Sequence, residues 1–252
     1  MNFRHIFLII LFLTTTLTAG LPIIKMVPPS EITSIFQQFL PENPVIIDAG
    51  AYDGTDGKRF AKKWPNSQVH CFEPIPQIFT LLCDNVQNMP NMFVYNCALS
   101  SENGTSEMFI SEFRNTPGVP SHSASLRRPK DHLIHAPHVV FPRTVEVETF
   151  TIDTWAELHG IDHVDMMWLD MQGVELEVLK ASPNIMATAQ VIIIEVEFVE
   201  AYEGQSQYHE IKNWLEHQGF IMVWCNFDPN NPTQHDAYCG DVLFIKKDLF
   251  FQ

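Results

Sequence analysis

Length, composition and charge limit the kinds of protein that this sequence encodes. The chain has 252 residues, of which 46% are hydrophobic and 18% are charged, so it is long and apolar enough for one globular α/β domain and is not disordered. Its formal net charge of -15 disfavours nucleic acid as a substrate, because an acidic surface repels a phosphate backbone.

The first 24 residues have the pattern of a secretory signal peptide or an N-terminal membrane anchor. Arg4 and His5 precede the apolar octet Ile6–Leu13, and no further charge occurs before Lys25. The uncharged residues 6–24 are just long enough to span a bilayer, so membrane association would run through them. We therefore separate residues 1–24 from a domain that occupies residues 25–252.

The cysteines favour a different compartment from the one that the N-terminus suggests. The chain has five, an odd number, and no close spacing among them is typical of a metal site. We interpret them as free thiols of a reduced compartment. The localisation therefore stays open between export or membrane anchoring and the cytoplasm. The residues are Cys71, Cys83, Cys97, Cys225 and Cys239.

Residues 30–96 are predicted to alternate between helices and strands. A short helix with one buried face starts near Ser30, and the apolar runs that follow are typical of buried strands. Helical patterns separate these runs, which gives a β-α-β-α-β order and hence parallel strands. The predicted strands are Val45–Ile47, Gln68–Phe72 and Met92–Asn96.

Residues 100–162 interrupt this alternation as an insertion. Thr105–Ile110 and Thr144–Thr149 have strand patterns, and a proline-rich connection with several histidines lies between them. A connection of that length without regular structure is usually functional, so a lid over a site is one interpretation.

The α/β alternation resumes after the insertion and completes the sheet. Helices are predicted at Gly173–Lys180 and Gln205–Gln218, and four further strands surround them. We predict a Rossmann-like α/β fold with a mostly parallel seven-stranded sheet, helices on both faces and one inserted β segment. The four strands are Val164–Leu169, Val191–Val196, Phe220–Cys225 and Asp241–Lys246.

A glycine-containing turn after the first strand is the first candidate binding element. In Asp48-x-Gly50-x-x-x-Gly54, Gly50 lets the backbone approach a ligand, and the helix that follows can receive a carboxylate at its N-terminus. Asp48 suits an ammonium better than a pyrophosphate. Glu73 ends the second strand, where an acid in this fold accepts hydrogen bonds from ribose hydroxyls. Together these residues predict a nucleoside-cofactor site.

Longer stretches of the sequence resemble the FkbM family of methyltransferases, over roughly Val45 to Ile245. The family usually has Asn after the Gly-Ala of the first motif and Lys two residues before the Asp of the last; this chain has Tyr52 and Trp168 there. The stretches are Ile46–Ala51, Phe72–Pro74, Asn96–Ser100, Ser123–Leu126, Val147–Asp153 and Leu169–Glu175, of which the last is the most specific.

The resemblance implies a class I methyltransferase that uses S-adenosyl-L-methionine and mostly methylates hydroxyl groups of small molecules or glycans. It implies that Asp48, Gly50 and Gly54 hold the methionine end, that Glu73 holds the ribose, and that Asn96 and Ala98 lie beside the adenine. The full expected cofactor set is Asp48, Gly50, Ala51, Asp53, Gly54, Glu73, Pro74, Asn96, Ala98 and Asp170.

The general base is sought where strands end at the carboxyl edge of the sheet. Asp170 ends one central strand and is our first candidate, and Glu195 on the next strand is the second. His122 in the insertion is the rival, because imidazole side chains titrate near neutral pH. We expect no metal, since the histidines of the insertion are irregularly spaced.

Two other functions remain open at this stage. A non-catalytic protein that keeps the cofactor pocket would bind S-adenosylmethionine without turnover. An NAD-type oxidoreductase is disfavoured, because the turn lacks G-x-G-x-x-G and has an acid before its first glycine.

Overall fold

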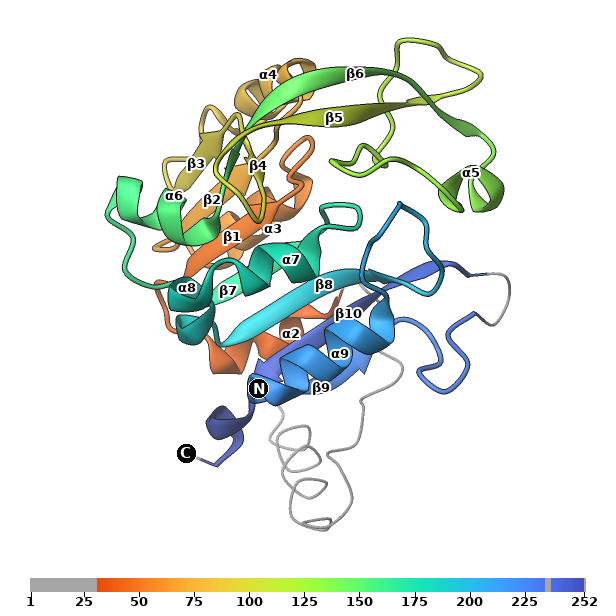
Figure 1. The fold of residues 1–252 in the computed structure, drawn as a ribbon. Helices are drawn as coiled ribbons and strands as arrows, with labels where there is room; N and C mark the ends of the chain where they lie inside the picture. The colour runs from red at the N-terminus through yellow and green to blue at the C-terminus, as the bar shows by residue number, and fades with distance from the viewer. Residues whose placement is uncertain (1–30, 234–236, 252) are drawn as a thin grey trace.

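The computed structural model describes residues 31–233 and 237–251, and its centre is a seven-stranded sheet (Figure 1). The strand order is β3-β2-β1-β7-β8-β10-β9, and neighbouring strands are parallel except where β10 pairs with β8 and β9. The expected mostly parallel Rossmann-like sheet is confirmed. The strands are β1 (Val45–Ala49), β2 (Gln68–Phe72), β3 (Met92–Tyr95), β7 (Met166–Leu169), β8 (Val191–Glu197), β9 (Phe220–Cys225) and β10 (Cys239–Lys246).

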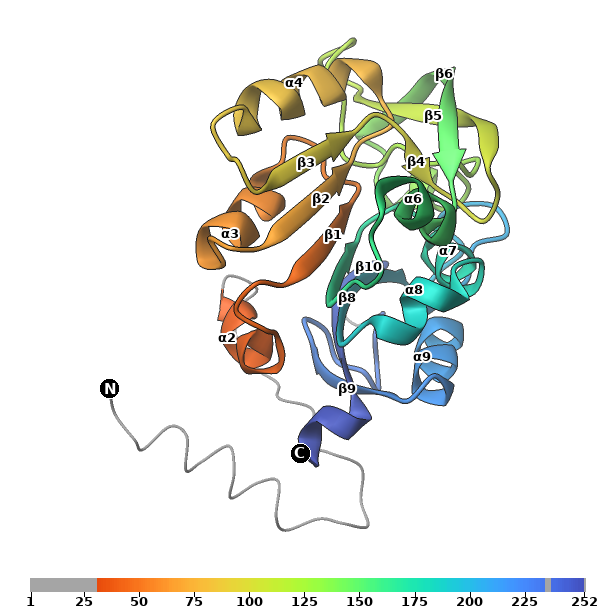
Figure 2. The same ribbon diagram turned by 90° about the vertical axis from the view of Figure 1, so that its left-hand side faces the viewer.

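Helices cover both faces of this sheet, because successive strand side chains point to opposite sides (Figure 2). Ile46 and Met166 pack into one apolar cluster with α2, α3 and α4, whereas Ile47 and Met167 pack into another with α6 to α9. The first group is α2 (Thr33–Phe36), with the short η2 (Gln37–Phe39), α3 (Thr55–Lys63) and α4 (Pro76–Val86). The second is α6 (Ile152–His159), α7 (Glu175–Lys180), α8 (Pro183–Thr188) and α9 (Tyr208–His217); η4 (Lys247–Phe250) follows β10.

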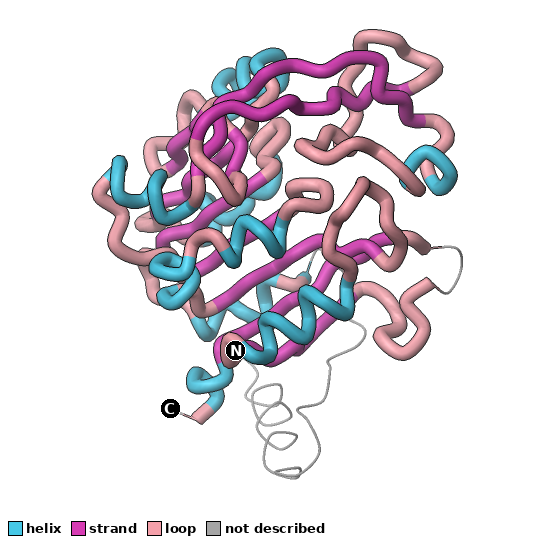
Figure 3. Tube along the Cα trace, in the orientation of Figure 1, coloured by secondary structure: helices cyan, strands magenta, loops and turns pink. Residues whose placement is uncertain are grey.

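The insertion forms a second, three-stranded sheet with the order β4-β6-β5. Figure 3 shows its two long strands lying together above the edge of the main sheet. Their connection returns to the segment after β8, where the Lys130 amide donates to the Ala201 carbonyl and the Glu203 amide to the Arg128 carbonyl. The expected inserted β segment is therefore confirmed. Its elements are β4 (Ala98–Leu99), β5 (Gly104–Phe113), α5 (His132–His135) and β6 (Val139–Phe150).

The structure can be compared with the prediction for the cysteines but not with the prediction for residues 1–24. Residues 1–24, with the proposed signal peptide or anchor, lie outside the described residues. Across residues 31–233 and 237–251, none of the helices combines the length and apolar character that a bilayer span requires. Cys71, Cys83, Cys97 and Cys239 are free thiols, and Cys71, Cys97 and Cys225 are buried.

Candidate functional site

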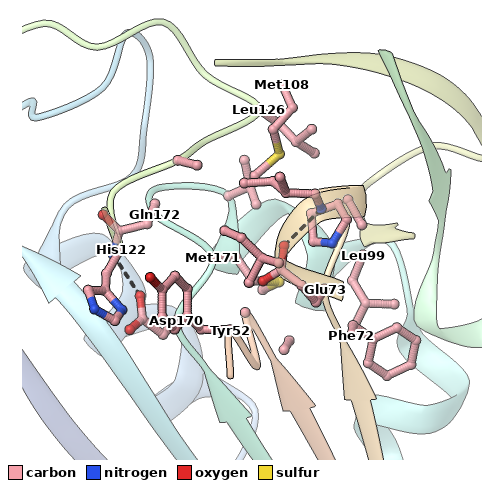
Figure 4. A pocket seen from close by; sticks show the side chains of 18 of the residues that line it. Tyr52, Phe72, Glu73, Leu99, Met108, His122, Leu126, Asp170, Met171 and Gln172 are labelled. Atoms are coloured by element: carbon pink, nitrogen blue, oxygen red, sulfur yellow. Dashed lines mark hydrogen bonds between the residues drawn. The ribbon is translucent and has the colours of Figure 1, made fainter. Parts of the chain in front are cut away.

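A cavity opens at the carboxyl edge of the parallel strands, where the insertion faces the sheet, and holds about 640 Å³ of space when its open mouth is included (Figure 4). Strand ends are the expected place for a ligand in such a fold, since the connections on either side diverge there. The lining residues come from the ends of β1, β2 and β7, the start of α4 and the insertion. They are Ala49, Gly50, Tyr52, Phe72, Glu73, Pro74, Ile75, Ile78, Cys97, Ala98, Leu99, Met108, Ser121, His122, Ala124, Leu126, Asp170, Met171, Gln172 and Val174.

Gly50 is where the ends of β1 and β7 touch. It has a left-handed φ of 81°, and a Cβ built on it would lie 1.9 Å from the backbone oxygen of Asp170. The Asp170 amide in turn donates to the Ala49 carbonyl at 3.0 Å. Only glycine permits this approach, so Gly50 brings Asp170 beside the turn after β1.

Asp48 lies behind that turn and not in the cavity wall. Its carboxylate accepts a hydrogen bond from the Gly57 backbone in the first turn of α3, and the Cys71 thiol donates to its Oδ2 over 3.7 Å. Burial, followed by the nearby Asp56, raises the pKa of Asp48 to about 7. The structure thus directs Asp48 to the N-terminus of α3, where helix amides need an acceptor, instead of toward a cofactor ammonium.

Three other residues of the turn also support the wall from behind. The Ala51 amide donates to the Phe72 carbonyl at 3.0 Å, which ties the turn to the end of β2. Asp53 Oδ1 accepts from the Thr55 amide at 2.9 Å, and Gly54 has a left-handed φ of 79° just before α3. None of Ala51, Asp53 and Gly54 is among the described residues that line the cavity.

Glu73 presents a buried carboxylate to the cavity from the end of β2. Its Oε1 accepts from the Ile75 amide at 2.8 Å, while Asn96 Nδ2 donates to the backbone carbonyls of Glu73 and Pro74. Asn96 thus fixes this segment without itself reaching the cavity. Burial raises the pKa of Glu73 to about 8, against the hydrogen bond from Ile75. Ala98 lines the cavity beside them.

Asp170 and Glu195 form a linked pair of carboxylates at the ends of β7 and β8. Gln172 Nε2 donates to Asp170 Oδ1 at 2.6 Å and to Glu195 Oε2 at 2.5 Å. Burial raises the pKa of both acids, and for Glu195 the nearby Asp170 is the next cause. Asp170 and Gln172 line the cavity, whereas Glu195 stands one hydrogen bond behind them.

The insertion supplies the opposite wall with Ser121 and His122. The rings of His122 and Tyr52 are 3.9 Å apart between centroids, and Tyr52 has a left-handed φ of 48° (Figure 4). Ser121 is only 2% exposed, yet its Oγ has no hydrogen-bond partner among the residues that the structure describes. A buried hydroxyl without a partner is costly, so a ligand in the cavity would satisfy it.

The structure therefore divides the residues that the sequence singled out. It brings Gly50, Glu73, Pro74, Ala98 and Asp170 to the cavity and leaves Asp48, Ala51, Asp53, Gly54, Asn96 and Glu195 behind its walls. Sequence reasoning passed over Ser121 and Gln172. Gln172 lies inside the most specific motif, which was a usable signal, whereas Ser121 lies in a loop without periodicity and had none.

The cavity fits S-adenosylmethionine better than a pyrophosphate-bearing dinucleotide. Glu73 offers acceptor oxygens for ribose hydroxyls, and Phe72, Leu99 and Ile78 offer an apolar wall for a base. None of the described lining residues is Lys or Arg, so the cavity offers no cationic side chain to a pyrophosphate. Within the described chain, no group of three or more His, Cys, Asp or Glu side chains is arranged to hold a metal ion.

Comparison with known families identifies the chain. A model described as the methyltransferase FkbM domain matches residues 48–222, which run from the end of β1 to the middle of β9. The chain belongs to this family. It is an S-adenosylmethionine-dependent methyltransferase, and the NAD-type oxidoreductase is set aside.

The chain is also similar to two curated relatives and to one solved structure. The chain is 32% identical over 173 residues to 2-O-methyltransferase NoeI of Sinorhizobium fredii, covering 69% of this chain and 71% of NoeI. It is 27% identical over 204 residues to methyltransferase sdnD of Sordaria araneosa, covering 73% and 76%. A Streptococcus thermophilus rRNA methylase structure aligns with a TM-score of 0.49 at 11% identity, covering 88% of this chain and 98% of that one. That likeness says nothing about the substrate of this chain.

Proposed function

We propose that this FkbM-family protein transfers a methyl group from S-adenosylmethionine to a hydroxyl of a small molecule or glycan. The observation that carries the proposal is the single cavity that joins Glu73, a ribose-type acceptor, to Asp170, a base-type carboxylate. The similarity to NoeI, a 2-O-methyltransferase, supports oxygen as the methyl acceptor. The net charge of -15 argues against a nucleic acid acceptor.

For the cofactor end, we assign contacts to the wall made by β1 and β2. Glu73 would accept hydrogen bonds from the ribose hydroxyls, and Gly50 would leave room for the methionine end. Pro74 and Ala98 would border the adenine together with Leu99. Asp48, Ala51, Asp53, Gly54 and Asn96 would act indirectly, since they hold the backbone of this wall in place.

For catalysis, we assign the proton acceptor to Asp170. The bound cofactor supplies an activated methyl group on a sulfonium. The protein must then orient the acceptor oxygen and remove its proton, and a general base contributes about 10²–10⁴-fold. Asp170 lies at the cavity with Glu195 linked behind it through Gln172. His122 also lines the cavity and remains the rival base.

The experiment that tests the function is transfer of an isotopically labelled methyl group. Incubating the protein with labelled S-adenosylmethionine and a panel of sugars and alcohols should yield a labelled ether and S-adenosylhomocysteine. Native mass spectrometry of the purified protein should show retained cofactor. Cofactor binding with no turnover on any acceptor, including native extracts, would favour the non-catalytic alternative. Absence of cofactor binding would contradict both.

We also propose, on sequence alone, that residues 1–24 direct export or anchor the protein in a membrane. The support is the apolar run Ile6–Leu13 behind Arg4 and His5. N-terminal sequencing of the native protein separates the two outcomes, since a cleaved signal removes this segment and an anchor retains it. A full-length, freely soluble cytosolic product would contradict the proposal.

A further inference from the structure

The side-chain amide of Gln172 lies at the centre of a hydrogen-bond network at the ends of β7 and β8. Its nitrogen donates to Asp170 and Glu195, and its oxygen accepts from the Tyr202 hydroxyl at 2.6 Å. These contacts join the ends of β7 and β8 to the segment that follows β8.

The hydrogen count fixes how this amide is oriented. A primary amide has two N–H donors, and here one points to each carboxylate. The reverse orientation would place the amide oxygen against two carboxylate oxygens, where it has no hydrogen to accept from an ionised acid. The two acids therefore receive one donor each, and each bond to an ionised carboxylate is a strong one.

The backbone of Gln172 is also held in an unusual conformation. Its φ is 59°, in the left-handed region that a side-chain-bearing residue seldom adopts. Ser125 Oγ from the insertion donates to the Gln172 carbonyl at 2.6 Å and holds it there. Such strain persists only where surrounding contacts enforce it, and it is concentrated at functional sites.

We propose that Gln172 is a positioning residue: its amide fixes Asp170 and Glu195 relative to the cavity and stabilises the ionised carboxylate that receives the acceptor's proton. This inference rests on the assignment of Asp170 as the base under the proposed function. Without these donors, two neighbouring buried carboxyl groups resist ionising together, because each negative charge raises the pKa of the other group. The hydrogen bond from Gln172 opposes burial and lowers the pKa of Asp170.

The other groups that act on this pair come from every element around it. Most are acids, which disfavour ionisation, so the two N–H donors of Gln172 are needed to counter them. The imidazole of His122, in the insertion, acts in the opposite sense and lowers the pKa of Asp170. The acids are Asp48 of β1, Asp56 of α3, Glu175 of α7, Glu197 of β8 and Asp241 of β10, and the Tyr202 hydroxyl faces the same pair.

The test is a carbon-13 NMR titration of side-chain carboxyl carbons in the full chain without cofactor. Loss of signals in Asp170→Asn and Glu195→Gln assigns the pair. In Gln172→Met, which has a similar length and no donors, the first titration midpoint of the pair should rise by about one pH unit or more, the effect of losing one charge-assisted bond. Gln172→Asn keeps an amide that is too short to reach both acids, so it should give a smaller rise.

A matched control removes another glutamine–aspartate bond at the opposite edge of the sheet. Gln190 Nε2 donates to Asp165 Oδ1 at 2.9 Å, so Gln190→Met should leave the midpoints of Asp170 and Glu195 unchanged. Unchanged or lower midpoints in both Gln172 variants would overturn the proposal. The titration needs neither cofactor nor acceptor, so this outcome is distinct from failure of the protein to bind S-adenosylmethionine, which would overturn the proposed function.

Discussion

The two walls of the cavity are held together by bonds that draw on different parts of the chain. In the wall made by β1 and β2, the side-chain bonds of Asp53 to Thr55 and of Glu73 to Ile75 each join residues two apart. In the opposite wall, Gln172 is bonded to Glu195 and Tyr202 across 23 and 30 residues and to Ser125 across 47. The first wall also relies on Asn96, which donates to the Glu73 and Pro74 carbonyls from 23 and 22 residues away, but all of these bonds stay within residues 48–96. The second wall additionally needs the insertion and the segment after β8.

Gly50→Ala should have the largest effect, because Gly50 is where the two walls meet. The new Cβ would overlap the Asp170 carbonyl in a backbone conformation that alanine resists, so we expect a loss of at least about 3 kcal/mol in the free energy of unfolding. Urea denaturation measures this loss. Gly118 has a φ of 83° with nothing within 4 Å, so Gly118→Ala should cost only about 1 kcal/mol. Equal losses would show that the close approach is unimportant.

Asp170→Asn tests the wall that carries the chemistry. It keeps the size of the side chain and removes the base, so turnover of labelled methyl should fall at least about a hundredfold. The affinity for S-adenosylmethionine should change much less, because our proposal assigns the ribose to the other wall. Full turnover in this variant, together with loss of turnover in His122→Ala, would move the base to the insertion.

Ser125→Ala should loosen the second wall without disturbing the first. It removes the hydroxyl that donates to Gln172 and accepts from the Arg127 amide, at a cost of about 1 kcal/mol. Hydrogen exchange should become faster in residues 121–136 and around Gln172, with β1 and the turn after it unchanged. Uniformly faster exchange in both walls would mean that they are not independent.

Glu73→Gln should reveal a smaller electrostatic cost within the first wall. The pKa of Glu73 is raised from 4.5 to about 8 in the fold, so its contribution to stability is complete below about pH 4.5 and is lost as the pH rises to 8. Glutamine has no charge to bury. At pH 8 the cofactor-free variant should melt several °C above wild type, and at pH 4 the gain should vanish. A gain of the same size at both pH values would exclude this cause.

The wall made by β1 and β2 is also the part of the site that could be predicted from the sequence. Gly50 and Glu73 lie at ends of strands that apolar runs predict, and the parallel order brings those ends to one edge. The seven strands and the inserted β segment followed from the same runs. The direction in which the Asp48 side chain points could not be predicted from the sequence, because it depends on how closely α3 packs at Gly57.

The second wall could not be assembled from sequence patterns. Asp170 could be predicted because it follows the end of a strand, but the partners of Gln172 are brought together only by tertiary packing. Ser121 and His122 lie in an irregular connection where neither helical nor strand periodicity marks a buried side chain. The docking of the insertion against the segment after β8 is a long-range contact of the same kind.

Calorimetric titration of the full chain with S-adenosylmethionine tests the central claim most directly. We predict saturable binding of S-adenosylmethionine and of S-adenosylhomocysteine, no binding of NAD, and a loss of about 1–3 kcal/mol in cofactor affinity for Glu73→Ala, the range for a hydrogen bond to a charged group. Unchanged cofactor affinity in Glu73→Ala, or binding of NAD in place of S-adenosylmethionine, would contradict the assignment of this cavity as the cofactor site.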